Sequence, residues 1–183
     1  MTRIWIVALL LFGLRAFGAG VAGGPTVEPP PGWKDANADG KMAGVLIALK
    51  GPETSSFILR RAPSAPMDNA AGVRHYLNDV LGGMRQASGR DYTSSGRVES
   101  RIFRNGLTVT LLRAQENGEE RLVLAVFSAN GAAHLAVLMS AAPEAMLPSL
   151  LGALQYGAVE GEVKTSGFAR SLDGQLELAL GGG

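Results

Sequence analysis

Three Asn-Gly pairs constrain the fold of this chain more than any other feature of its sequence. Asn105-Gly106, Asn117-Gly118 and Asn130-Gly131 follow one another at intervals of twelve and thirteen residues. Asn and Gly tolerate the positive φ that both central residues of a two-residue type I′ hairpin turn require. The runs between the turns are rich in residues that favour strands. The pairs therefore predict a four-stranded antiparallel meander over 97–104, 107–113, 120–128 and 132–140.

The same turns predict the register of the meander. Two-residue loops place Ile102 opposite Val109, Leu111 opposite Leu124, Val126 opposite Leu135, and Leu124 opposite Val137. All of these side chains then lie on one side of the sheet, as a side-chain period of two requires. The later strands are apolar on their other side as well. We therefore expect the end of the meander to be covered on both faces.

Two helices and an early hairpin complete the expected elements. Apolar residues recur at helical spacing from Val73 to Met84, with Asp68 or Asn69 as the cap and Gly89 at the end. Ala142-Pro143-Glu144 opens a second helix, in which Pro148 either causes a kink or marks the true start. Strands at 43–49 and 56–60 form the hairpin, preceded by an Asp39-Gly40 turn. The expected fold is α+β, an antiparallel sheet of hairpin and meander with helices packed on its faces.

The N-terminus predicts export. Arg3 precedes an apolar run over 4–12, and small residues follow it, which is typical of a signal peptide over residues 1–22. A retained membrane anchor is the alternative, but the run is shorter than a spanning helix and Arg15 closes it. The chain has no Cys, which excludes a lipoprotein anchor. We expect an exported protein, periplasmic or secreted, with no stable membrane anchor after cleavage.

The rest of the chain divides into three parts. A Pro/Gly-rich lead-in over 23–32 is expected to have little structure of its own, and the α+β domain covers 33–156. A C-terminal extension over 157–183 follows, with a candidate hairpin at Ser171–Leu178 and a disordered Gly tail. Without Arg3 and Arg15, 15 of the 17 basic residues remain against 16 acidic ones. This balance disfavours nucleic acid and anionic membrane surfaces as partners.

One segment resembles half of a calcium-binding loop. Asp35, Asn37 and Asp39 alternate before Gly40, as the first oxygen ligands of an EF-hand loop do. The twelfth position, which should hold a bidentate Glu, is Leu46. The alternative is a hairpin loop that uses Asp-Gly for its backbone angles. These three residues are weak metal candidates, and we expect no cofactor.

The remaining polar residues do not predict an active site. His75 is expected on the solvated side of the first helix, paired with Asp79, whereas His134 is expected in a strand opposite Phe127. His134 is thus either a histidine at the edge of the core or part of a ligand pocket. No Gly-x-Ser-x-Gly motif and no cluster of His with acids is present. We therefore expect a protein that is not an enzyme.

Arg97, Arg101 and Arg104 share one strand, with Arg113 nearby and Glu99 among them. Charged side chains on an edge strand usually prevent strand addition by other chains. The alternative is that these arginines form a docking surface for an acidic partner.

The order of elements resembles the PsbP-like superfamily. The resemblance includes the Pro30-Pro31-Gly32-Trp33 entry, the hairpin strand Phe57-Ile58-Leu59-Arg60, the helix over 73–84, the meander, and the close at Leu154-Gln155-Tyr156. It covers residues 32–156 and implies an antiparallel sheet with helices on both faces. It also implies a lineage of exported accessory or binding proteins with no shared active-site motif. A cystatin-like α+β fold is the alternative, because it too packs a helix on a meander.

These observations lead to one expected function and one alternative. We expect a non-enzymatic accessory or binding protein of the cell envelope that acts through a protein partner. The alternative is a module that binds a small molecule or a metal.

Overall fold

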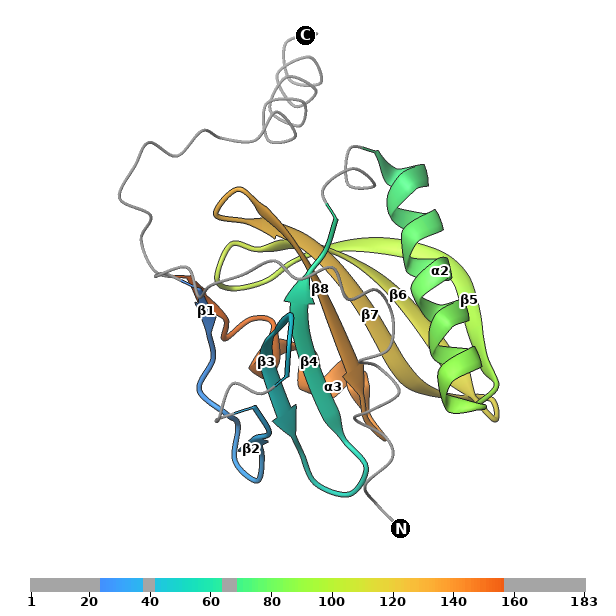
Figure 1. Ribbon diagram of the computed structural model, residues 1–183, viewed down its shortest axis with the longest axis horizontal. Helices are drawn as coiled ribbons and strands as arrows, with labels where there is room; N and C mark the ends of the chain where they lie inside the picture. The colour runs from blue at the N-terminus through green and yellow to red at the C-terminus, as the bar shows by residue number, and fades with distance from the viewer. Residues whose placement is uncertain (1–23, 38–41, 64–68, 157–183) are drawn as a thin grey trace, which may run out of the picture.

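The computed structural model describes residues 24–37, 42–63 and 69–156, whose elements Figure 1 shows. The helices are α2 (Ala70–Ser88) and α3 (Pro143–Leu150). The strands are β1 (Pro25–Thr26), β2 (Lys34–Asp35), β3 (Val45–Lys50), β4 (Ser56–Arg61), β5 (Tyr92–Ile102), β6 (Thr108–Glu116), β7 (Glu119–Ala129), β8 (Ala132–Met139) and β9 (Gln155–Tyr156).

Seven strands form one antiparallel sheet in the order β2-β3-β4-β8-β7-β6-β5. The early hairpin, β3 with β4, joins the meander because β4 pairs with β8 along Ser56–Arg61. The two edges of the sheet are therefore the short β2 and the long β5. The predicted fold class, an antiparallel sheet of hairpin and meander with helices on its faces, is confirmed. The predicted Asp39-Gly40 turn lies outside the described residues.

The second and third hairpins of the meander form as predicted. In the Asn117-Gly118 turn both residues have positive φ, +55° and +81°, and Glu116 pairs with Glu119. The Asn130-Gly131 turn, with φ of +50° and +71°, brings Ala129 opposite Ala132. The register of the last two strands is confirmed, with Val126 opposite Leu135 and Leu124 opposite Val137.

The predicted register of the first hairpin is wrong by one residue. Ile102 lies opposite Thr108 instead of Val109, because the loop has three residues. Gly106 alone has the positive φ (+80°), and its N–H donates to the carbonyl of Phe103 over 2.8 Å. The Asn105 side chain instead donates to the carbonyls of Leu151 and Leu154, over 2.8 and 3.0 Å. Asn105 thus holds the chain that follows α3.

The predicted register of the second hairpin holds only near its turn, because a bulge shifts the pairing farther along the strands. The pairing of β6 with β7 shifts between Ala114 and Gln115, so that Leu112, and not Leu111, lies opposite Leu124. A bulge inserts one extra residue and moves the side chains beyond it to the opposite face. Val109 and Leu111 therefore pack on the α3 side of the sheet, and Leu124 packs on the α2 side.

Helix α2 covers one face of the sheet. Asn69 caps its start by accepting the N–H of Gly72 over 2.8 Å, and Gly89 ends it with a φ of +66°, as predicted. The predicted apolar stripe is confirmed, because its residues pack on the inner side chains of β5, β6, β7 and β8. Its buried members are Val73, Leu77, Leu81 and Met84.

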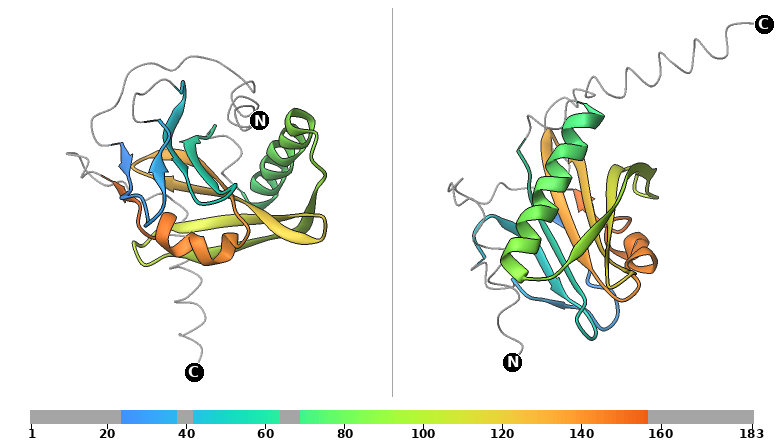
Figure 2. Two further views of the ribbon diagram at one scale, coloured as in Figure 1. Left: turned by 90° about the horizontal axis from the view of Figure 1, so that it is seen from below. Right: turned by 90° about the vertical axis from the view of Figure 1, so that its right-hand side faces the viewer.

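Helix α3 covers the opposite face, as Figure 2 shows from below. Pro143 occupies its first turn and Pro148 lies inside its eight residues. Its leucines pack on the sheet side chains that face away from α2, among them Val123, Ala125 and Phe127. Strands β7 and β8 are therefore buried on both faces, which confirms that expectation.

The two ends of the domain meet in a second, two-stranded sheet. Pro25 pairs with Tyr156 and Thr26 with Gln155, so the lead-in expected to have little structure of its own forms one short strand. Val27 then packs against the core on the α3 side. The predicted signal peptide and the C-terminal extension, with its Ser171–Leu178 hairpin, lie outside the described residues. Among the described helices, neither is long and apolar enough to cross a membrane.

Candidate functional site

The three arginines singled out in the sequence have different surroundings. Arg101 binds Glu144 at the start of α3 and, over 3.3 Å, Glu99 of its own strand. The Nε atom of Arg104 donates to the carbonyl of Gly152 over 3.2 Å. Arg97 is exposed, and its side chain makes no ion pair with another residue in the described part of the chain. The prediction that the three share one strand is wrong for Arg104, which lies in the turn after β5. The strand therefore does not present three equivalent arginines to a partner.

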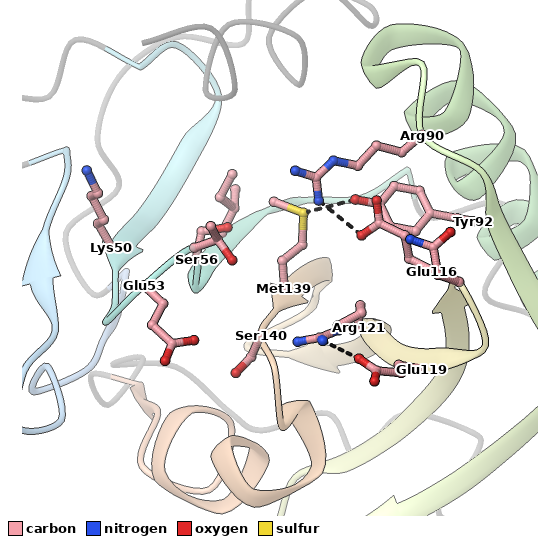
Figure 3. A pocket seen from close by; sticks show the side chains of 13 residues that line it. Lys50, Glu53, Ser56, Arg90, Tyr92, Glu116, Glu119, Arg121, Met139 and Ser140 are labelled. Atoms are coloured by element: carbon pink, nitrogen blue, oxygen red, sulfur yellow. Dashed lines mark hydrogen bonds and ion pairs between the residues drawn. The ribbon is translucent and has the colours of Figure 1, made fainter. Parts of the chain in front are cut away.

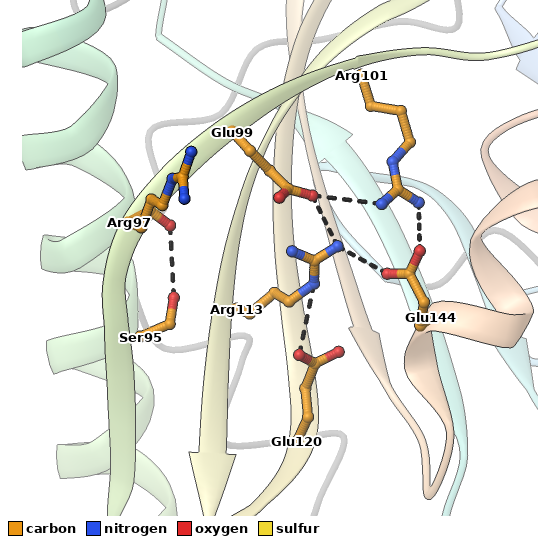
Figure 4. Close-up of polar contacts among 7 residues, drawn as sticks. All are labelled: Ser95, Arg97, Glu99, Arg101, Arg113, Glu120 and Glu144. Atoms are coloured by element: carbon orange, nitrogen blue, oxygen red, sulfur yellow. Dashed lines mark hydrogen bonds and ion pairs between the residues drawn. The ribbon is translucent and has the colours of Figure 1, made fainter.

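Arg101 belongs to an arginine–glutamate cluster of Glu99, Arg101, Arg113, Glu120 and Glu144 (Figure 4). Arg113 is its centre, with Glu99 at 2.7 Å, Glu144 at 2.8 Å and Glu120 at 3.4 Å. Only 21% of the Arg113 side chain is exposed. The cluster ties three strands of the meander to the first turn of α3. Sequence reasoning used Glu144 only to mark the start of the second helix and missed this role.

The electrostatics of the cluster follow from these contacts. The hydrogen bond from Arg113 lowers the pKa of Glu99. Burial alone would raise the pKa of Glu144, but hydrogen bonds from Arg101 and Arg113 outweigh it and lower the pKa. At Glu120 burial dominates and raises the pKa. Two guanidinium groups thus face three carboxylates that are already paired within the chain. This arrangement holds elements together and offers little unpaired charge to a ligand.

The outer side of β5 forms one of the two edges of the seven-stranded sheet. We call residues 97–102 the β5 edge. Ile102 is 74% exposed and is the one large apolar side chain among the described residues with such exposure. Arg97, in the same strand, is exposed as well. In Figure 1, β5 lies at the outer margin of the sheet with α2 crossing it.

The calcium-loop candidates are used within their own loop. Asp35 accepts the N–H of Asn37 over 2.7 Å, and Asn37 accepts the N–H of Met42 over 2.9 Å. These are the side-chain to backbone bonds of a turn. Asp39 lies outside the described residues. Within the part of the chain that the structure describes, His, Asp and Glu side chains form no group that could hold a metal ion.

His134 is buried in an aromatic group on the α3 side of the sheet. It lies opposite Phe127, as predicted, and its ring stacks on Phe127 with 5.3 Å between centroids. Tyr156 of β9 meets the His134 ring edge-on at 5.6 Å. Burial lowers the pKa of His134, a backbone hydrogen bond with Ala132 opposes this, and Arg61 lowers it further. Neither Nδ1 of His134 nor the hydroxyl of Tyr156 has a hydrogen-bond partner among the described residues.

An open pocket lies on the α2 side of the sheet, beyond the area that α2 covers. Its volume is about 530 Å³, and it separates the β3–β4 hairpin from the β6–β7 turn. Figure 3 shows Lys50 and Glu53 on one wall and Arg90 with Glu116 on the other, with Met139 between them. We call this the hairpin pocket. Sequence reasoning missed it, because its walls meet only through the pairing of β4 with β8.

The charges of the hairpin pocket are balanced but not all paired. Arg90 binds Glu116 over 3.1 Å, and Arg121 binds Glu119. The hydroxyl of Tyr92 donates to the sulfur of Met139 over 3.7 Å. Lys50 and Glu53 make no ion pair with any other described residue. The pocket can therefore offer one cation and one anion to a solute, beside an apolar patch of Ile58 and Met139. His134 does not line it.

Comparisons with known proteins find similarity to solved structures. No family model matches the chain, and no curated protein matches it. The chain is similar to the solution structure of cyanobacterial PsbP (CyanoP) from Synechocystis sp. PCC 6803, with a TM-score of 0.46 and 17% sequence identity. The similarity covers 79% of this chain and 98% of that one.

Proposed function

We propose that this protein is an exported, non-enzymatic accessory or binding protein of the cell envelope that acts through a protein partner at the β5 edge. We also propose that it is a member of the PsbP-like superfamily, on the order of its elements over 32–156. The signal-peptide pattern of residues 1–22 supports export.

The observation that carries the proposal is the open β5 edge. Natural sheets usually shorten, cover or charge their edge strands, since an open edge is a template for another strand. Here β2 is short, but β5 runs for 11 residues and ends in the 74% exposed Ile102. Of its charged side chains, Glu99 and Arg101 are paired within the chain, which reduces the protection that they give this edge. Arg101 and Arg104 bind groups of their own chain, which leaves Arg97 and Ile102 for a partner.

Affinity purification tests this proposal. Tagged mature protein would be incubated with the envelope fraction of its source, and the retained proteins compared with those on an Ile102→Lys variant. We expect at least one stoichiometric protein, either another species or an untagged copy of this chain, to be lost with the variant. Gln115→Lys is the matched control, because Gln115 is exposed on the interior strand β6. An identical set of retained proteins on all three baits would reject the proposal.

The hairpin pocket favours a second candidate function, the binding of a small zwitterionic solute. Its volume of about 530 Å³ lies within the range of small-molecule pockets and leaves room for an amino acid or a dipeptide. The charges available to such a ligand are those of Lys50 and Glu53. Calorimetric titration with amino acids and dipeptides tests this candidate, with Lys50→Met and Glu53→Gln as variants that should each weaken binding. The absence of binding heat at millimolar ligand would reject it.

A further inference from the structure

The backbone of β5 presents three residues to any strand that approaches the β5 edge. The N–H of Phe103 donates to the carbonyl of Leu107 in β6, over 2.9 Å. Successive residues of a strand turn their backbone N–H and C=O groups to alternate sides, so the backbone groups of Arg101 and Glu99 also face β6. The backbone groups of Val98, Ser100 and Ile102 therefore point away from the sheet. They have no strand beside them, because β5 is the last strand in the order.

The side chains of the same five residues are complementary to themselves. The sequence Val98-Glu99-Ser100-Arg101-Ile102 reads apolar, acidic, polar, basic, apolar. An antiparallel copy centred on Ser100 brings Glu99 opposite the second copy's Arg101 and Val98 opposite its Ile102. The twofold symmetry makes each contact twice. On the face of Val98 and Ile102, Ser100 meets its own copy.

Neighbouring registers are much less favourable. The backbone groups that face outward must pair with one another. In the next register either way, the partner of a given residue therefore changes by two positions along the second copy. One step in either direction centres the pairing on Glu99 or on Arg101, so that two like charges lie directly opposite each other. Like charges in that position destabilise a strand pair. Only the register centred on Ser100 satisfies the backbone, the charges and the apolar side chains together.

We propose that the β5 edge binds a second copy of this chain by antiparallel strand pairing centred on Ser100, which joins two sheets into one. The inference rests on the proposed function, since it names the partner at the same edge. The pairing covers the exposed Ile102 of each copy with Val98 of the other. It also extends the arginine–glutamate cluster of each copy across the twofold axis.

The dimer should be weak and dependent on concentration. The positive φ of Gly96 (+72°) and the register shift between Ser94 and Val98 bend β5 away, so the paired segment ends near Arg97. Five residue pairs bury less area than a stable protein interface, and interfaces of this size are typically transient. Glu99 and Arg101 already have partners in their own chain, which limits what the new pairs add.

Sedimentation velocity over a range of concentrations measures the association. We expect a monomer–dimer equilibrium for the wild type, with a dissociation constant raised about tenfold or more by Ile102→Lys, because symmetry counts each substitution twice. Gln115→Lys adds the same charge away from the edge and should leave the constant unchanged. Ile102 is exposed, so its variant should fold normally, which circular dichroism would verify.

Cross-linking tests the register itself. The chain has no Cys, so Ser100→Cys provides a single thiol at the twofold axis. Residues directly opposite in such a pair lie about 5.5 Å apart, within reach of a disulfide. We expect oxidation to give a covalent dimer. The control Thr93→Cys, on the same strand, should stay monomeric, because its two copies lie roughly 45 Å apart at about 3.3 Å per residue.

Two results would overturn this inference. A wild type that stays monomeric at the highest concentrations, or cross-linking of Thr93→Cys as efficient as that of Ser100→Cys, would exclude the pairing. If another protein is still lost from the Ile102→Lys bait, the proposed function stands and only the identity of the partner is wrong. If that bait loses nothing either, both proposals fail.

Discussion

Individual residues of this protein show how burial decides what a polar group does. His134 is 3% exposed, with its ring stacked on Phe127 and edge-on to Tyr156, where a charge would be poorly solvated. Its pKa is lowered from the ordinary value of 6.5, chiefly by burial. The folded protein therefore prefers the neutral imidazole.

This preference makes stability depend on pH. Below about 6.5 the unfolded chain binds a proton that folded His134 does not, so the free energy of unfolding should fall as the pH decreases from 6.5. His134→Phe keeps the stacking and should remove this loss, which urea denaturation at pH 7.5 and at pH 5 would measure. His75→Phe is the control, because the His75 side chain is 82% exposed. An unchanged pH dependence in His134→Phe would contradict the argument.

Arg113 illustrates the difference between a half-buried and an exposed ion pair. Removal of its guanidinium leaves Glu99, Glu120 and Glu144 without their shared partner. We expect Arg113→Met to lower the free energy of unfolding by about 1–2 kcal/mol, allowing for solvent around the glutamates. Arg121→Met, which removes an exposed pair with Glu119, should cost less than about 0.5 kcal/mol. Equal losses in chemical denaturation would show that the cluster does not act as a unit.

At the scale of elements, two Asn-Gly turns with the same sequence work in different ways. Asn117 supplies a positive φ of +55°, whereas Asn105 supplies a side chain that donates to the carbonyls of Leu151 and Leu154. Replacement with Gly separates these roles. Asn117→Gly should be neutral or slightly stabilising in the turn, because Gly adopts positive φ without strain.

Asn105→Gly should lower the free energy of unfolding by about 1–2 kcal/mol, because two carbonyls after α3 lose their donor. Asn117→Ala should lower the free energy of unfolding by about 1 kcal/mol, because Ala adopts positive φ only with strain. Thermal denaturation of the three variants would check the order. If Asn105→Gly were as stable as Asn117→Gly, the contact with α3 would have no energetic role.

The difference between local and distant contacts decides how far the sequence could predict the fold. The turn at Asn117 and the turn at Asn130 depend on local backbone angles, which the residues themselves dictate, and both were predicted with their loop length. The caps of α2 at Asn69 and Gly89 are local too. The shifts at Asn105 and at the bulge after Ala114 depend on contacts with α3 and on packing between strands. The residues next to these two positions give no signal that would predict the register shifts.

The candidate site was less predictable for the same reason. Arg97, Arg101 and Arg104 were recognised as one group, but their separation depends on Glu144 and Gly152, which are about 40 to 50 residues away in the chain. The hairpin pocket arises only when β4 pairs with β8. Exposure of Ile102 likewise follows from its place at the edge of the completed sheet.

At the scale of the whole molecule, the two ends of the domain close over the aromatic group. Strand β1 pairs with β9, and Tyr156 of β9 contacts both Phe127 and His134, at 6.4 and 5.6 Å between centroids. Val27, which follows β1, packs against the same core. The segment before Trp33 is therefore part of the folded domain, and the stability of the core should depend on it.

Truncation of the segment before Trp33 tests this dependence. A protein that begins at Glu28 lacks β1 and Val27, and should unfold with a free energy about 1–3 kcal/mol lower than one that begins at Gly23, given the loss of one half-buried Val and of a strand pair. Loss of β1 should also loosen Tyr156 and admit water to His134, so the pKa of His134 should move up towards its ordinary value. NMR titration of the imidazole would detect that shift, and His75 in the same spectra would serve as the internal control. If the two proteins had the same stability but His134 titrated differently, β1 would shield the aromatic group without supporting the sheet; if neither quantity changed, the pairing of β1 with β9 would contribute nothing to the domain.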